Sequence, residues 1–133
     1  MSTLAVGTIK SLSSAPPVFQ NTSGTEKGQL VKAWCNFDQT DHSIRDSFNV
    51  SSLTDLAVGQ TEVNYTNSMS NTNYCGVIYN NARSVEIVIN NFQNSWVGGM
   101  VLYTNKMAVS AYGSSSPSFQ DSKIFTVLAI GDN

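Results

Sequence analysis

The sequence is poor in charged residues. Asp, Glu, Lys and Arg make up 12% of the 133 residues, whereas an average soluble domain contains about 25%. The seven basic residues are scattered along a chain with a net charge of −2. Because a phosphate backbone is bound by clustered Lys and Arg, we expect no binding to nucleic acid. Ser, Thr and Asn replace the missing charge, which suits contact with copies of the same chain or with uncharged ligands such as glycans.

Histidine and cysteine are also scarce. His42 is the only histidine and lies in a polar turn, where we expect a solvated surface residue. One histidine does not provide the usual zinc ligand set. Cys35 and Cys75 are the only cysteines, too few for a disulfide framework. We interpret both as buried free thiols within strands.

The remaining polar residues form no recognisable catalytic or metal-binding pattern. Asp38, Asp41 and Asp46 are close in sequence, but their spacing does not match a calcium loop, and we interpret them as turn carboxylates. Nine scattered acids give no sign of the paired carboxylates that glycan hydrolysis needs. The pair Gly98-Gly99 falls inside a predicted strand rather than in a phosphate-binding loop. We therefore expect a protein without enzymatic activity, cofactor or metal.

Long apolar runs are missing. No stretch approaches the roughly 20 apolar residues that span a bilayer, so we expect no membrane insertion. The first ten residues contain neither a charged start nor an apolar run of the kind found in a signal peptide. We therefore expect synthesis in a cytoplasm.

A period of two dominates the chain after residue 30. Within Val31–Phe37, Ala33 and Cys35 alternate with Trp34 and Asn36, which is typical of a half-buried strand. The polar residues 39–43 predict a hairpin turn to a second strand, Ser43–Leu53, on which Ile44, Phe48 and Val50 share a face. Residues 55–60 then predict a turn with a glycine near its end.

Further strands follow at intervals of roughly 8 to 12 residues, and this spacing predicts an all-β protein, an antiparallel β-sandwich or jelly-roll-like fold. The last run is apolar on both faces, so it is either a central strand or lies under a subunit interface. The predicted strands after residue 60 are Glu62–Thr66, Tyr74–Tyr79, Val85–Ile89, Trp96–Tyr103, Met107–Tyr112 and Ile124–Ile130.

Residues 1–28 differ from the β-sandwich domain predicted for residues 29–133. They are rich in Ser, Thr, Pro and Gly, and Pro16-Pro17 favours an extended segment. Their isolated apolar residues bury too little area to offset the entropy of ordering. Two interpretations remain open, a flexible tail and an extended arm that orders against neighbouring subunits or a virion socket.

Several words at fixed spacing resemble the fibre or fibre-like proteins of tailed bacteriophages, especially marine phages and cyanophages. The similarity covers roughly the first 80 residues, although a polar turn at residues 38–42 replaces the Gly-rich turn of that family. The matching words are Met1–Leu4, Thr8–Lys10, Pro16–Thr25, Lys32–Trp34, Asn36-Phe37, Ile44–Ser52, Thr54-Asp55, Val63–Tyr65, and Met69 with Asn71 and Asn73-Tyr74.

The resemblance implies a virion structural protein made in the bacterial cytoplasm. It would be a fibre or fibre-tip component, a homotrimer that joins other virion proteins through residues 1–28 and presents a β-domain, with host attachment as a further role. Two alternatives are a capsid decoration or cement protein and a lectin-like module that binds a host cell-surface glycan or protein.

Two sets of candidate residues follow from these hypotheses. Exposed aromatic rings stack on sugars, so the receptor or glycan candidates are Trp96, Tyr103 and Tyr112. Apolar residues of the arm, or on faces that the sandwich core does not need, are candidates for contacts between copies. These interface candidates are Leu4, Val6, Phe19, Trp34, Ile124 and Leu128.

Overall fold

The computed structural model describes the chain in segments, and it divides the protein into two units, residues 1–30 and residues 31–133. The described segments are residues 5–10, 19–24, 26–28, 30–80, 85–86, 99–113 and 119–131.

The first unit contains one short hairpin. Strand β1 (Phe19–Gln20) pairs antiparallel with β2 (Glu26–Gly28). In the connecting turn the Asn21 side chain accepts hydrogen bonds from Ser23, and Gly24 adopts a positive φ of 78°. Every side chain of this unit that the structure describes is exposed, including Val6 and Ile9. The described part of the unit therefore provides no core of its own.

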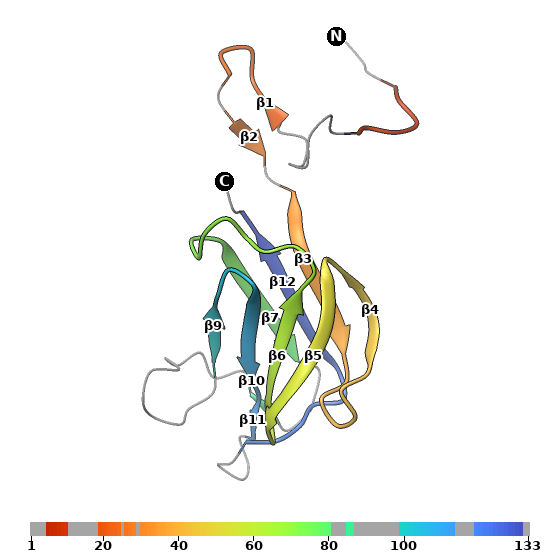
Figure 1. Ribbon diagram of the computed structural model, residues 1–133, viewed down its shortest axis with the longest axis vertical. Coiled ribbons are helices and arrows are strands. Elements are labelled where there is room, and N and C mark those ends of the chain that lie inside the picture. The colour runs from red at the N-terminus through yellow and green to blue at the C-terminus, as the bar shows by residue number, and fades with distance from the viewer. Residues whose placement is uncertain are drawn as a thin grey trace. The chain divides into compact units, whose positions relative to one another are not determined.

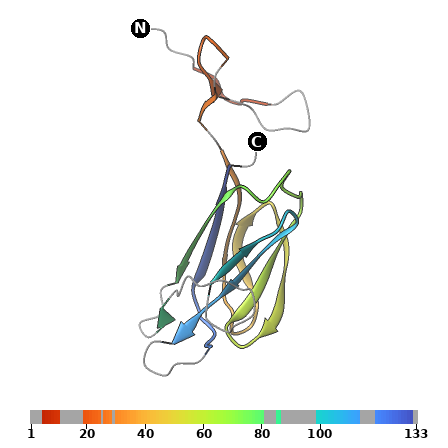
Figure 2. The same ribbon diagram turned by 90° about the vertical axis from the view of Figure 1, so that its left-hand side faces the viewer.

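The second unit is an antiparallel β-sandwich, which confirms the expected fold class (Figure 1). One sheet has the order β4-β3-β12-β7 and the other has the order β5-β6-β10-β9, and Figure 2 shows the two layers from the side. Strands β8 and β11 form a separate pair. The strands are β3 (Val31–Phe37), β4 (Ile44–Phe48), β5 (Val50–Ala57), β6 (Gln60–Tyr65), β7 (Cys75–Asn80), β8 (Val85–Glu86), β9 (Met100–Leu102), β10 (Lys106–Ser110), β11 (Tyr112–Gly113) and β12 (Phe125–Ile130).

The core is built from one face of each sheet, because side chains alternate along a strand. On the two central strands of the first sheet, Phe37 is opposite Phe125 and Cys35 is opposite Val127. All four side chains are at most 2% exposed. The second sheet contributes alternate residues of β6 and β10, namely Val63, Tyr65, Met107 and Val109. The central position of β12 between β3 and β7 confirms the interpretation of the last apolar run.

The single strand predicted over residues 43–53 is wrong. Asn49 has a positive φ of 56°, and the chain leaves the first sheet as β4 and enters the second as β5. The Asn49 side chain stabilises this corner by donating to the carbonyl of Lys32 and accepting from the backbone N–H of Asn67. Phe48 and Val50 therefore belong to different sheets and do not share a face.

The turn predicted at residues 39–43 is confirmed, and carboxylates organise it. Asp38 accepts hydrogen bonds from the N–H and hydroxyl of Thr40, and Asp41 accepts the same pair from Ser43. This is the Asx-turn chemistry that Asp favours. Gln39 is fully buried within the turn, where its amide accepts from the N–H of Ser122 and donates to Thr61.

Other strand boundaries differ from the prediction. Strand β5 continues to Ala57, so the turn expected at residues 55–60 is confined to Val58 and Gly59. Only parts of two predicted strands, residues 85–89 and 96–103, lie within the described residues. The run predicted over Met107–Tyr112 divides into β10 and the start of β11.

Candidate functional site

The outward side of sheet β4-β3-β12-β7 carries the most unusual surface of the described domain. Strand β3 points Ala33, Cys35 and Phe37 into the core, so Trp34 leaves the sheet on the opposite side. By the same alternation, β12 points Leu128 and Ile130 outward. Both central strands therefore place large apolar side chains on the side of the sheet that faces away from the core.

The register aligns these side chains in a row that crosses the whole sheet. Phe48 on β4 is opposite Trp34 on β3. Trp34 is opposite Leu128 on β12, which in turn is opposite Val77 on β7. Tyr79 and Ile130 lie on the same side of the sheet, in the rows next to this one. We call this surface the apolar face, made of Phe48, Trp34, Leu128, Val77, Tyr79 and Ile130.

The apolar face is open in the single chain. The exposed fractions are 54% for Phe48, 46% for Val77 and 58% for Tyr79, and Trp34 and Leu128 are half-buried by their neighbours. Contiguous apolar patches of this kind usually mark a contact with another molecule. The side of the row toward Tyr79 carries the polar residues Asp46, Asn36 and Thr126, and the Arg45 guanidinium donates to Asn36. Lys32 lies on the other side of the row.

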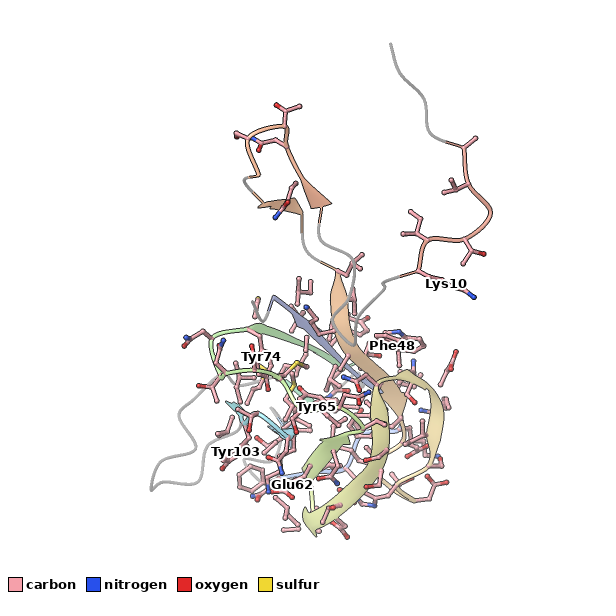
Figure 3. The ribbon with its side chains drawn as sticks, turned by 45° about the horizontal axis from the view of Figure 1, so that its top comes forward. Lys10, Phe48, Glu62, Tyr65, Tyr74 and Tyr103 are labelled. Carbon is pink, nitrogen blue, oxygen red and sulfur yellow. The ribbon has the colours of Figure 1, made fainter. Side chains whose placement is uncertain are left out.

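The outward side of the other sheet has the opposite character. Glu62 and Lys106 form an ion pair at 2.6 Å, and the Lys106 ammonium lies 5.1 Å from the ring centroid of Tyr103. The Asn64 amide donates to the hydroxyls of Ser52 and Thr54 on the neighbouring strand. Figure 3 shows Glu62 and Tyr103 well away from Phe48 on this domain. The polar side chains of this second surface thus already pair with one another.

The predicted interface residues lie in different parts of the structure. Trp34 and Leu128 are brought into direct cross-strand register, and Ile124, 39% exposed, lies just before β12. Val6 is exposed in the first unit, and Phe19 begins β1. Leu4 lies outside the described residues, as does the side chain of Phe19.

The predicted glycan contacts do not form a described cluster. Tyr103 is 42% exposed, but the Lys106 ammonium already lies over its ring. Trp96 and the side chain of Tyr112 lie outside the described residues. Of the three candidate side chains, the structure therefore describes only that of Tyr103. Among the described residues, no second candidate lies beside it.

His42 is not the solvated residue expected from its turn position. Its Nε2 atom lies 3.3 Å from the hydroxyl of Thr61 and 3.6 Å from a carboxylate oxygen of Asp55. A catalytic triad needs the acid on one ring nitrogen and the nucleophile on the other, whereas here both partners meet Nε2. Thr61 is also fully buried. We interpret the cluster as a contact that joins the two sheets.

The carboxylates of the hairpin turn are engaged by their own backbone. Asp38 also forms an ion pair with Arg45 at 2.8 Å. Hydrogen bonds from Thr40 and the Arg45 guanidinium hold the pKa of Asp38 below its ordinary value, although partial burial acts in the other direction. Hydrogen bonds from Ser43 likewise lower the pKa of Asp41. Among the described residues, no group of three His, Cys, Asp or Glu side chains gathers to hold a metal ion.

The two cysteines are both free but differ in environment. Cys35 is fully buried, and desolvation raises the pKa of its thiol to about 12. Cys75 is exposed, which corrects the expectation that both thiols are buried. It is opposite Ile130 and two residues from Val77 on the same strand, so it borders the apolar face.

Sequence reasoning missed Phe48, Val77 and Tyr79 as members of this surface. The strand Cys75–Asn80 carries apolar residues at both parities, so alternation alone did not show which parity faces the core. The structure shows that Gly76 and Ile78 take the inward positions, with Gly76 beneath Met100 and Leu102.

Comparison with known proteins gives no relative from which to assign this surface. No protein-family model matches the chain, and no curated protein or solved structure matches it either. Among the described residues, no helix is long and apolar enough to cross a membrane.

Proposed function

We propose that the protein is a structural component of a tailed-phage virion, a fibre or fibre-tip subunit that works as a homotrimer and has no enzymatic activity. In this assembly residues 1–28 join other virion proteins, and the β-sandwich forms the body of the appendage. Host attachment is a further role of the presented surface.

One observation carries this proposal, the contrast between the two outward sheet faces. A domain that acts alone has no use for an open row of Phe48, Trp34, Leu128 and Val77. A subunit of an assembly needs one face that packs and one that meets solvent. The Glu62–Lys106 pair and the Asn64 hydrogen bonds make the second sheet suitable for the solvent side.

The first unit supports the same proposal. Its described side chains are exposed throughout, and its hairpin of five strand residues is too small to be stable alone. Such a segment gains order when it binds a partner. The sequence resemblance to phage fibre proteins extends across this segment and the first hairpin of the sandwich.

The test is to locate the protein on intact particles with a gold-labelled antibody. A fibre component gives label on the tail only. Label spread over the shell would overturn the proposal and favour a capsid decoration protein, and particles without label would exclude the chain from the virion.

A further inference from the structure

We infer that the apolar face is the surface through which copies of this chain contact one another. Its occupant is the same face of a second copy, while the sheet that carries Glu62 and Lys106 remains outside. The contact between two copies follows from the structure alone, and a third copy is required only by the proposed function.

The dimensions of the apolar face favour another sheet as the occupant. Four strands spaced by ~4.8 Å and six residues rising by ~3.3 Å each give a flat area on the order of 400 Å². A helix with its side chains is only about 10–12 Å wide, so it would cover the row or the length of the strands, but not the whole face. A second sheet covers the full width and packs at about 10 Å. The area is about half of the ~800 Å² per partner of a standard interface, so residues around the apolar face have to contribute the rest of the contact.

The chemistry of the face also favours a copy of itself. Its row offers aromatic and aliphatic side chains with neither charge nor amide groups, so a charged or strongly polar partner would lose hydration without gaining hydrogen bonds. Lys32 and Asp46 lie outside the row, where a polar rim of an interface is normally found. The other outward sheet face is a poor occupant because burying it would desolvate the Glu62–Lys106 pair.

The reaction rate of the Cys75 thiol reports whether the apolar face is covered. Cys35 is buried and its pKa of about 12 keeps it protonated, so at pH 8 a disulfide reagent such as DTNB reports Cys75 in the folded protein. The full chain is studied between 1 and 100 μM by analytical ultracentrifugation and by thiol kinetics. We expect a species of at least twice 14.4 kDa and at least a tenfold slower thiol reaction in the assembled protein.

A matched pair of substitutions places the contact on this face. Val77→Lys puts a charge in the row, whereas Val58→Lys puts the same charge on a more exposed valine, 61% against 46%, in the β5–β6 turn. We expect Val77→Lys to raise the concentration of half-assembly at least tenfold and Val58→Lys to leave it unchanged. Phe48→Lys, at a 54% exposed position, provides a second variant if Val77→Lys fails to fold by circular dichroism.

Each contrary outcome overturns the inference. A 14.4 kDa species with a reactive Cys75 at 100 μM shows that the face stays open. The same species with a protected Cys75 shows that another part of the same chain, rather than a second copy, covers the face. Assembly that Val77→Lys and Phe48→Lys do not weaken uses another surface. Assembly through this face by a protein absent from the phage tail would refute the proposed function and leave this inference intact.

Discussion

Trp34 and Leu128 are register partners on the two central strands of one sheet, and both side chains point away from the sandwich core. Because side chains alternate along each strand, their neighbours occupy the core face and packing in the core does not account for this pair. The pair extends to Phe48 and Val77 on the flanking strands. The resulting row therefore belongs to the sheet as a whole, and the following predictions separate its role from that of the core.

Phe37→Ala and Phe48→Ala should differ sharply in their effect on folding. Phe37 is fully buried and its ring centroid lies 5.3 Å from that of Phe125, so its truncation should cost about 3–5 kcal/mol of unfolding free energy. Phe48 is 54% exposed, and its truncation should cost less than ~1 kcal/mol. Urea denaturation below the concentration of assembly measures both. Equal losses would mean that Phe48 is part of the folded core.

Gly59→Ala should destabilise the sandwich strongly. Gly59 has a positive φ of 71°, and a Cβ atom there would lie 2.7 Å from the carbonyl oxygen of Ala111 and 2.7 Å from the backbone nitrogen of Gln120. Backbone atoms cannot move aside cheaply, so we expect a loss of more than ~2 kcal/mol in thermal or urea unfolding. Gly7→Ala, where nothing lies within 4 Å, is the control and should be neutral. An unchanged free energy of unfolding in Gly59→Ala would contradict the backbone geometry described for this turn.

Substitutions at Asn49 should test the corner between the sheets. Asn49→Gly tolerates the positive φ but removes the side-chain hydrogen bonds to Lys32 and Asn67. Asn49→Ala removes the same hydrogen bonds and also disfavours the positive φ. We expect losses of about 1 kcal/mol for glycine and about 2–3 kcal/mol for alanine. Denaturation midpoints of the two variants check the order. If Asn49→Ala were as stable as Asn49→Gly or more stable, the corner would not depend on the positive φ.

Acid should destabilise the fold through the hairpin turn. The pKa of Asp38 is lower in the folded protein than its ordinary value of 3.8, so ionised Asp38 stabilises the fold above about pH 4. This contribution is lost as the pH falls below 3.8 and through the folded pKa. Urea midpoints at pH 7, 4 and 2.5 should therefore fall at the acid end.

The Asp38→Asn variant provides the control for this acid effect. It should be less stable than the wild type at pH 7 because its side chain carries no charge for Arg45 to pair with. Its further loss between pH 4 and 2.5 should be smaller than that of the wild type. An identical acid slope in both proteins would assign the effect to other carboxylates.

The position of Trp34 could be predicted from sequence because its strand is apolar at one parity and otherwise polar at the other. The corner at Asn49 could not, because its positive φ is stabilised by groups 17 and 18 residues away. The same reason hides the burial of Gln39, whose partners Thr61 and Ser122 are distant in sequence. Met69, in a polar loop, is only 4% exposed, since the tertiary fold rather than local pattern brings it to the core.

The most direct measurement of which sheet face joins the copies is a density map of the assembled protein that resolves its side chains. We predict that Trp34 and Leu128 of each copy lie against another copy, with Glu62 and Lys106 facing solvent. A map that places Glu62 and Lys106 at the contact between copies, and Trp34 and Leu128 in solvent, would contradict it.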